Sequence, residues 1–135
     1  TKQDMISTVR YIADSGADGI KLQLLHVLKN TVLEKMYING EFDVLTFEEY
    51  ADILCDCLME LPPDMVVHRF TGDGPKKILV APMWSADKKM VLNRLNRIVS
   101  DILTADLRKI RRFSLFSGES LLQLDRISAS SSGSV

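Results

Sequence analysis

Two kinds of apolar spacing alternate along this chain, and that alternation limits the folds it can adopt. Residues 1–15 carry apolar side chains at the intervals of an amphipathic helix, and Gly16 suits the end of that helix. Residues 18–27, DGIKLQLLHV, alternate between two faces instead, which predicts a strand. One face of this strand carries Ile20, Leu22 and Leu24, and the other carries Lys21, Gln23 and Leu25.

Two threonine–glutamate pairs mark the starts of further helices. Thr31 with Glu34 and Thr46 with Glu49 have the spacing of a capping box, in which two residues satisfy each other's backbone N–H groups. The first pair predicts a short helix that stops at Asn39-Gly40. The second predicts a longer helix that Pro62-Pro63 end. The apolar stripe of the longer helix is Phe47, Tyr50, Ala51, Leu54, Leu58 and Leu61.

A second strand and a last helix complete the pattern. The strand is expected at Met65 to Phe70, and the helix after Trp84. Strands that alternate with helices imply parallel pairing with helical crossovers. Because two strands alone leave unpaired edges, we expect the chain to be the end of a larger α/β barrel or doubly wound sheet. The alternative is a further strand at Ile78 to Ala81.

Charge and composition exclude several classes of protein. The 135 residues fit one domain, and an apolar fraction of 46% is enough to bury a core. The net charge of -1 gives no general attraction to nucleic acid or to an anionic membrane. No apolar run approaches the roughly 20 residues that span a bilayer, and no signal-peptide pattern is present. We therefore expect a cytoplasmic protein that does not contact the membrane.

The cysteines and histidines form no recognisable metal motif. Cys55 and Cys57 are too few for a disulfide scaffold and, two apart on a helix, point to nearly opposite sides. Neither they nor His26 and His68 have the spacing of a zinc site. The basic stretch Arg108 to Arg112 is typical of a solvated helix face, with nucleic-acid contact as the alternative.

Polar residues gather where the two predicted strands end. In parallel α/β folds, ligands bind at the carboxyl ends of the strands. The first strand ends at His26 to Lys29, and the second runs from Arg69 into GDGP, residues 72–75. GDGP matches neither the phosphate-loop nor the dinucleotide pattern. It is either a plain turn or a place where the backbone approaches a ligand closely, which glycine permits.

Three longer stretches carry a resemblance to a known family. They are GIKLQLLHVLKNTVLEKMY, then LTFEEYADILCDCLMELPPDMVVHRFTGDGP, then ILVAPMWSADKKMVLNRLNRI. In this order and spacing they resemble the C-terminal part of a bacterial radical SAM protein family, related to elongator-type and coproporphyrinogen-dehydrogenase-type enzymes. The resemblance implies an α/β fold: the C-terminal fragment of a partial TIM-type barrel, with parallel strands and crossover helices. We assign residues 1–112 to that barrel and leave 113–135 as an unassigned, flexible, Ser-rich tail.

The resemblance also implies a cofactor. Such enzymes cleave S-adenosylmethionine at a [4Fe–4S] cluster to a 5′-deoxyadenosyl radical, and three cysteines of a CxxxCxxC-type motif bind the cluster. This sequence lacks that motif, and Cys55 and Cys57 do not match it. We therefore expect the chain to be truncated before the cluster-binding part, with the cluster ligands on the missing N-terminal part of the same barrel.

The resemblance further implies that the second strand and its loop line the adenosine end of S-adenosylmethionine. The expected contributors are Gln23, His26, His68, Arg69, Thr71, Gly72, Asp73 and Gly74. RNA is a candidate substrate, since elongator-type relatives modify transfer RNA. The alternative function is a non-catalytic α/β binding module that acts through protein–protein contacts at its open sheet edge.

Overall fold

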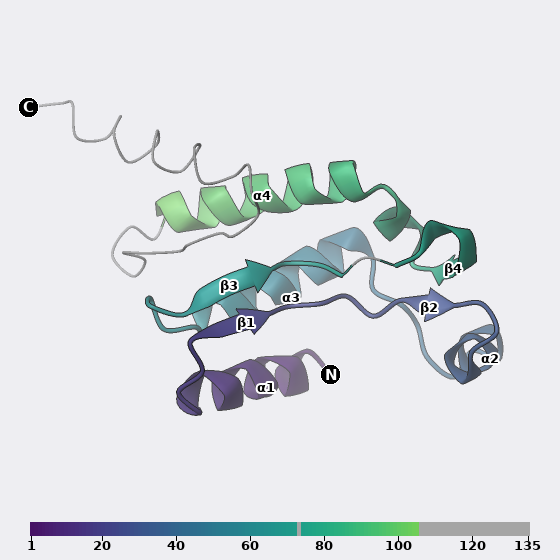
Figure 1. Ribbon diagram of the computed structural model, residues 1–135, viewed down its shortest axis with the longest axis horizontal. Helices are drawn as coiled ribbons and strands as arrows, with labels where there is room; N and C mark the ends of the chain where they lie inside the picture. The colour runs from purple at the N-terminus through teal and green to yellow at the C-terminus, as the bar shows by residue number, and fades with distance from the viewer. Residues whose placement is uncertain (73, 106–135) are drawn as a thin grey trace, which may run out of the picture.

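The computed structural model describes residues 1–72 and 74–105, without the side chains of 103–105. Asp73, the basic stretch Arg108 to Arg112 and the Ser-rich tail lie outside the described residues. The elements follow in the order α1 (Lys2–Asp14), β1 (Gly19–Lys21), β2 (Val27–Leu28), α2 (Val32–Ile38), α3 (Phe47–Met59), β3 (Val66–Arg69), η1 (Lys76–Ile78), β4 (Leu79–Ala81), η2 (Met83–Ala86) and α4 (Lys88–Ala105), as Figure 1 shows.

The central pairing is parallel, as the alternation of elements predicts. β1 lies beside β3 with Gly19 opposite Val66, and a bulge after Ile20 brings Lys21 opposite Arg69. The pairing continues one step beyond β1, since the N–H of Leu22 donates to the Arg69 carbonyl at 2.9 Å. The crossover between the two strands contains α2 and α3.

The strand expected over residues 18–27 is wrong in its extent and in its partners. Only Gly19–Lys21 belongs to the parallel pair, and Val27–Leu28 pairs instead with β4 in the antiparallel direction. The strand considered at Ile78 to Ala81 is therefore present, as Leu79–Ala81, but it is not parallel. The described residues thus form two separate two-stranded sheets, and a barrel is not seen among them.

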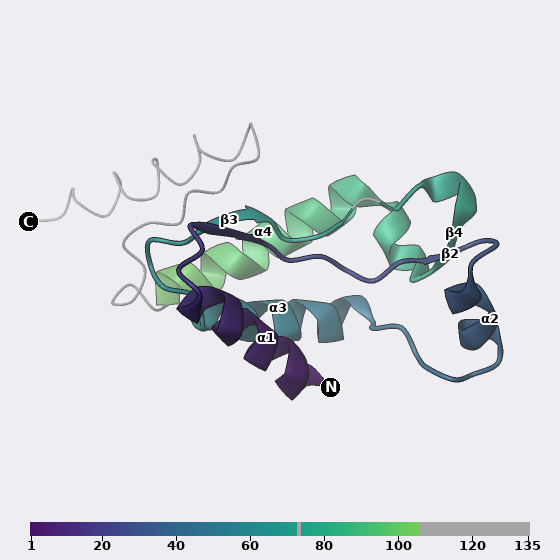
Figure 2. The same cartoon turned by 60° about the horizontal axis from the view of Figure 1, so that its bottom comes forward.

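Three helices cover one face of the β1–β3 pair. Ile20 and Val67 point into a core that also contains Leu54 of α3 and Leu95 of α4. Figure 2 shows α1 and α3 beneath the strands, with α4 running behind them. Three ion pairs join α1 to α3 and its C-cap residue: Lys2 contacts Asp52 and Asp56 at 2.5 and 2.6 Å, and Arg10 contacts Glu60, directly after α3, at 2.6 Å. α1 is thereby held against the rest of the core.

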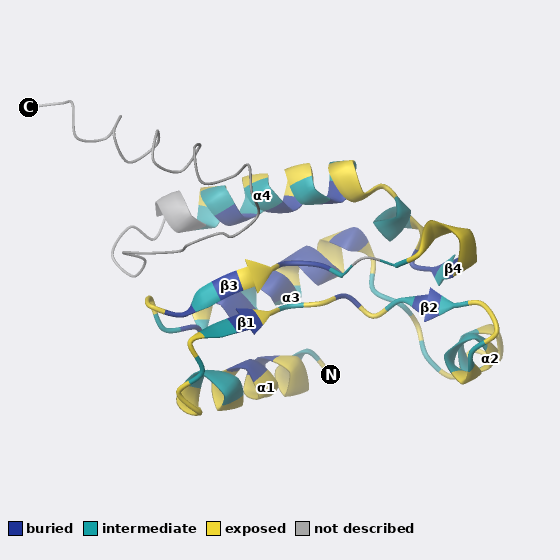
Figure 3. Cartoon of the chain, in the orientation of Figure 1, coloured by how far each residue is buried: buried dark blue, intermediate teal, exposed yellow. Residues whose placement is uncertain are grey.

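No described helix covers the opposite face of this strand pair. Lys21, Gln23, Leu25, His68 and Arg69 are all exposed, and Figure 3 shows the tips of β1 and β3 in the colour of exposed residues. The alternation of faces read from residues 20–25 is confirmed, because Ile20 and Leu24 are buried while Lys21, Gln23 and Leu25 are exposed. Within the described part of the chain, no helix is long and apolar enough to cross a membrane.

Candidate functional site

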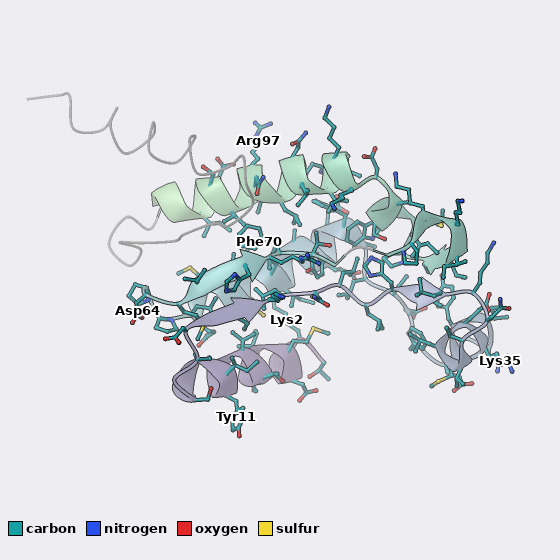
Figure 4. All side chains as sticks on the ribbon, viewed as in Figure 1. Lys2, Tyr11, Lys35, Asp64, Phe70 and Arg97 are labelled. Atoms are coloured by element: carbon teal, nitrogen blue, oxygen red, sulfur yellow. The ribbon has the colours of Figure 1, made fainter. Side chains whose placement is uncertain are left out.

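The carboxyl end of β3 is held in place by a hydrogen bond from α3. The hydroxyl of buried Tyr50 donates to the carbonyl of Phe70 at 2.5 Å. Burial raises the pKa of Tyr50, which keeps this hydroxyl a donor. Phe70 lies between the strand pair and α4, as its label in Figure 4 shows. The main chain is therefore held directly before the next residue, the buried Thr71.

Removal of the Tyr50 hydroxyl should destabilise the chain. We expect Tyr50→Phe to lower the free energy of unfolding by about 1–3 kcal/mol, because the buried Phe70 carbonyl loses its donor. Urea denaturation followed by circular dichroism measures this change. Tyr11→Phe is the matched control: Tyr11 is 77% exposed, so its loss should stay within about 0.5 kcal/mol. Equal losses in the two variants would contradict the assignment.

A cavity of about 160 Å³ opens directly after β3. One side is the backbone that follows the strand, and the other is formed by η2 and the start of α4, toward which this segment runs in Figure 1. The lining residues are Thr71, Gly72, Gly74, Lys76, Ser85, Ala86, Lys88 and Val91. The cavity therefore lies between the segment that follows β3 and the segment that leads into α4.

The far side of the cavity is anchored by Trp84. Its indole Nε1 donates to the carbonyl of Leu45 at 3.0 Å, and its ring lies edge-on to Phe47 and tilted against Tyr50. The next residue, Ser85, donates its hydroxyl to the Pro82 carbonyl at 2.8 Å. These contacts fix η2, and hence Ser85 and Ala86 at the cavity.

The cavity combines polar, basic and apolar groups. Lys76 and Lys88 bring positive charge, and the amino-terminal end of α4 adds the partial positive charge of the helix dipole. Asp87 caps this helix, since its carboxylate accepts from the N–H of Met90 at 3.0 Å. Ala86 and Val91 contribute apolar surface. Such a mixture suits a polar organic molecule with an apolar portion.

Comparison with known proteins decides the family. The model of the radical SAM C-terminal domain matches residues 17–101, which contain both strand pairs and all the cavity residues. The chain belongs to the radical SAM C-terminal domain family. The match begins after α1, so the first helix lies outside the region that defines the family.

Relatives of this radical SAM C-terminal domain occur in bacteria and archaea. The chain is 43% identical over 93 residues to the uncharacterized protein YtqA of Bacillus subtilis, covering 69% of this chain and 29% of YtqA. It is 24% identical over 98 residues to the protein YhcC of Escherichia coli, covering 73% of this chain and 32% of YhcC. An uncharacterized protein of Methanocaldococcus jannaschii is 30% identical over 98 residues, 72% of this chain and 30% of that protein. The chain thus spans about a third of the length of these relatives.

Only part of the predicted site meets at the cavity of this radical SAM C-terminal domain. Thr71, Gly72 and Gly74 line it, while Asp73 lies outside the described residues. Gln23, His68 and Arg69 are exposed, and they belong to the strand pair and its extension rather than to the cavity lining. His26 is half-buried and contacts the cavity wall from behind.

Of the two glycines of GDGP, Gly74 is needed for space rather than for turn geometry. Neither Gly72 nor Gly74 has a φ angle in the left-handed region. A methyl group added to Gly74 would lie 2.7 Å from Cδ2 of His26, and one added to Gly72 would lie 3.4 Å from Cε1 of the same ring. The plain-turn interpretation is therefore incomplete, because a side chain at residue 74 would collide with the imidazole.

The sequence interpretation missed the contribution of the last helix. Ser85, Ala86, Lys88 and Val91 line the cavity but precede or begin a helix that was considered only for its apolar face. The available signal was Asp87, a favourable capping residue directly before an apolar helical stripe. Such a start places backbone N–H groups and the end of a helix dipole at one point.

The cysteines do not form a cluster site within the described part of this radical SAM C-terminal domain. Cys57 is buried, Cys55 is half-buried, and burial raises the pKa of both thiols. A thiolate, the form that binds iron, is therefore disfavoured at both positions. Residues 1–72 and 74–105 also contain no group of three His, Cys, Asp or Glu side chains that could hold a metal ion.

Proposed function

We propose that this domain supplies part of the S-adenosylmethionine site of a radical SAM enzyme, with the cavity after β3 holding the adenosine end of the cofactor. The observation that carries the proposal is the position of this cavity, at the carboxyl end of a parallel strand within the region that defines the family. In such an enzyme, S-adenosylmethionine bound at a [4Fe–4S] cluster supplies the radical that abstracts hydrogen from the substrate.

The chemical types of the lining residues suit a nucleoside. The volume of the cavity is enough for only part of the cofactor. Ala86 and Val91 offer apolar surface to a base, while the glycine backbone and the Thr71 hydroxyl offer hydrogen-bonding groups. Pockets that enclose a whole ligand have volumes of roughly 300–1,000 Å³. The observed 160 Å³ therefore accommodates a portion of the molecule, and the remainder would contact other parts of the protein.

The described residues do not fit an iron–sulfur cluster, so we propose that its cysteines lie elsewhere in the longer protein. We also propose that β1 and β3 are two strands of a partial TIM-type barrel. Support comes from the distribution of helices, because α1, α3 and α4 cover one face of the pair while the other is left to face a barrel interior. RNA is our proposed substrate class, supported by Lys21 and Arg69, which are exposed opposite each other.

Filling the cavity should weaken cofactor binding. In the full-length protein that contains this chain, with its cluster reconstituted, we expect Ala86→Leu to reduce S-adenosylmethionine affinity about tenfold or more, because the added atoms occupy the cavity. Isothermal titration calorimetry measures the affinity, and a thermal melt monitors the fold.

Lys89→Leu is the matched control, since it introduces the same side chain at an exposed position that does not line the cavity. Its affinity should stay within about twofold of the parent's. Unchanged affinity in Ala86→Leu would disprove the site, and absence of binding by the parent protein would favour a non-catalytic binding module.

A further inference from the structure

His26 lies behind the wall of the cavity without lining it. Its imidazole ring occupies the space that a Cβ atom at Gly74 would enter and lies beside the Cβ position of Gly72, and its Nε2 atom is shielded from solvent. Gly72 and Gly74 are themselves cavity residues, whereas His26 is not. The ring thus borders two residues of the cavity lining without being a lining residue itself.

The position of this ring is fixed by the segment that carries it. Before it, Leu24 is buried and Leu22 is hydrogen-bonded to the end of β3. After it, Val27 is fully buried and begins β2. The main chain therefore has little freedom to move the imidazole away from the glycines, and the glycine backbone rests on a firmly placed ring.

The other histidine shows a similar contact in a different setting. A methyl group on Gly19 would lie 2.6 Å from Nε2 of His68, which is as close as the contact at Gly74. His68, however, is exposed on the uncovered face and can rotate into solvent. His26 is half-buried, so its ring has less room than that of His68 to move away from a side chain at residue 74.

We propose that His26 is a positioning residue, whose ring sets the location of the backbone at Gly72 and at Gly74 and thereby the shape of the cavity wall. The inference rests on the proposed function only in that the cavity holds the adenosine end of S-adenosylmethionine. His26 and Gly74 then form a matched pair: the ring takes the volume that a side chain at residue 74 would need. His26 acts through the glycine backbone and makes no cofactor contact of its own.

The proposal is tested by adding a methyl group at residue 74 and removing the imidazole at residue 26, separately and together. Four forms of the reconstituted full-length protein are compared: the parent, Gly74→Ala, His26→Ala, and the double variant. We expect Gly74→Ala alone to weaken S-adenosylmethionine binding about tenfold or more, because the added methyl pushes the wall away from the ring. His26→Ala alone should weaken it about threefold or more, because the wall loses its support.

The double variant decides the outcome. With the imidazole gone, the methyl at residue 74 has space, so adding Gly74→Ala to His26→Ala should change affinity by no more than about twofold. Equal effects of Gly74→Ala in the two backgrounds, or no loss of affinity in His26→Ala, would overturn the proposal. Gly16→Ala controls for general destabilisation: it strains a remote turn with φ of 79°, and should lower the melting temperature without changing affinity.

Melting temperatures of the same four proteins without cofactor separate this inference from the proposed function. If the parent does not bind S-adenosylmethionine, the proposed function fails, yet non-additive melting temperatures would still confirm the steric pair. If the melting temperatures are non-additive while the affinities add, the pair is structural only and His26 has no positioning role.

Discussion

Replacing Leu95 with alanine should lower the free energy of unfolding of this chain by about 2–5 kcal/mol. Leu95 lies in the middle of α4 with no exposed surface, and it belongs to the core that joins the strand pair to α3. The substitution removes buried methyl groups and leaves a cavity that the surrounding elements can close only in part. Chemical denaturation monitored by circular dichroism gives the change directly.

Leu25→Ala is the control that makes this result specific. It makes the same chemical change, but Leu25 is 57% exposed on the uncovered face of the segment that follows β1. We expect a loss below about 0.5 kcal/mol. A loss as large as that of Leu95→Ala would mean that this face is covered in solution, in contradiction to the exposure seen in the structure.

Replacing Trp84 with alanine should cost about 3 kcal/mol, the lower end of the range for a large aromatic residue because Trp84 is only partly buried. The variant loses the ring contacts with Phe47 and Tyr50 and the hydrogen bond to Leu45. The substitution removes the only tryptophan of the chain, and with it the tryptophan fluorescence. The loss is therefore measured by thermal and urea unfolding followed by circular dichroism.

Trp84→Phe separates the two contributions of the indole. It keeps an aromatic ring beside Phe47 and removes only the donor to Leu45, so a loss of about 1 kcal/mol is expected. If phenylalanine were as damaging as alanine, the hydrogen bond rather than the ring would hold η2 in place.

The helices could be predicted because their signals are local. Thr46 and Glu49 form the expected capping box, with the Thr46 hydroxyl accepting from the Glu49 N–H at 3.2 Å and the Glu49 carboxylate accepting from the Thr46 N–H at 2.8 Å. The box at Thr31 is only half formed, because the Glu34 carboxylate accepts from the N–H of Asn30 instead. Even so, the helix begins and ends where the sequence indicates.

Strand partners could not be predicted in the same way. The alternation of faces over residues 20–25 is real, but a ladder needs a neighbouring strand, and Ile20 and Val27 have different ones. Nothing in DGIKLQLLHV distinguishes the part that pairs with β3 from the part that pairs with β4. The antiparallel β2–β4 pair therefore emerges only from the three-dimensional arrangement.

The candidate site, like the fold, could be predicted from the sequence only in part. The end of β3 was identified because parallel strands present their carboxyl ends to ligands, and Thr71, Gly72 and Gly74 do line the cavity. The sequence also predicts His26 in this site, from its position at the end of the first expected strand and from the family resemblance. Position along a strand cannot distinguish a side chain that faces a cavity from one that supports its wall, and the closeness of the His26 ring to Gly74 is what suggests the second role that we propose.

The parallel pairing of β1 with β3 has a consequence for the order of folding. Gly19 meets Val66 only after the intervening chain, which contains α2 and α3, has been brought into a closed loop. Helices with their own caps need only neighbouring residues, so they can form while the two strands are still apart. We therefore expect the strand pair, and with it the contact of His26 with the glycines after β3, to be completed late, when the helices are already in place.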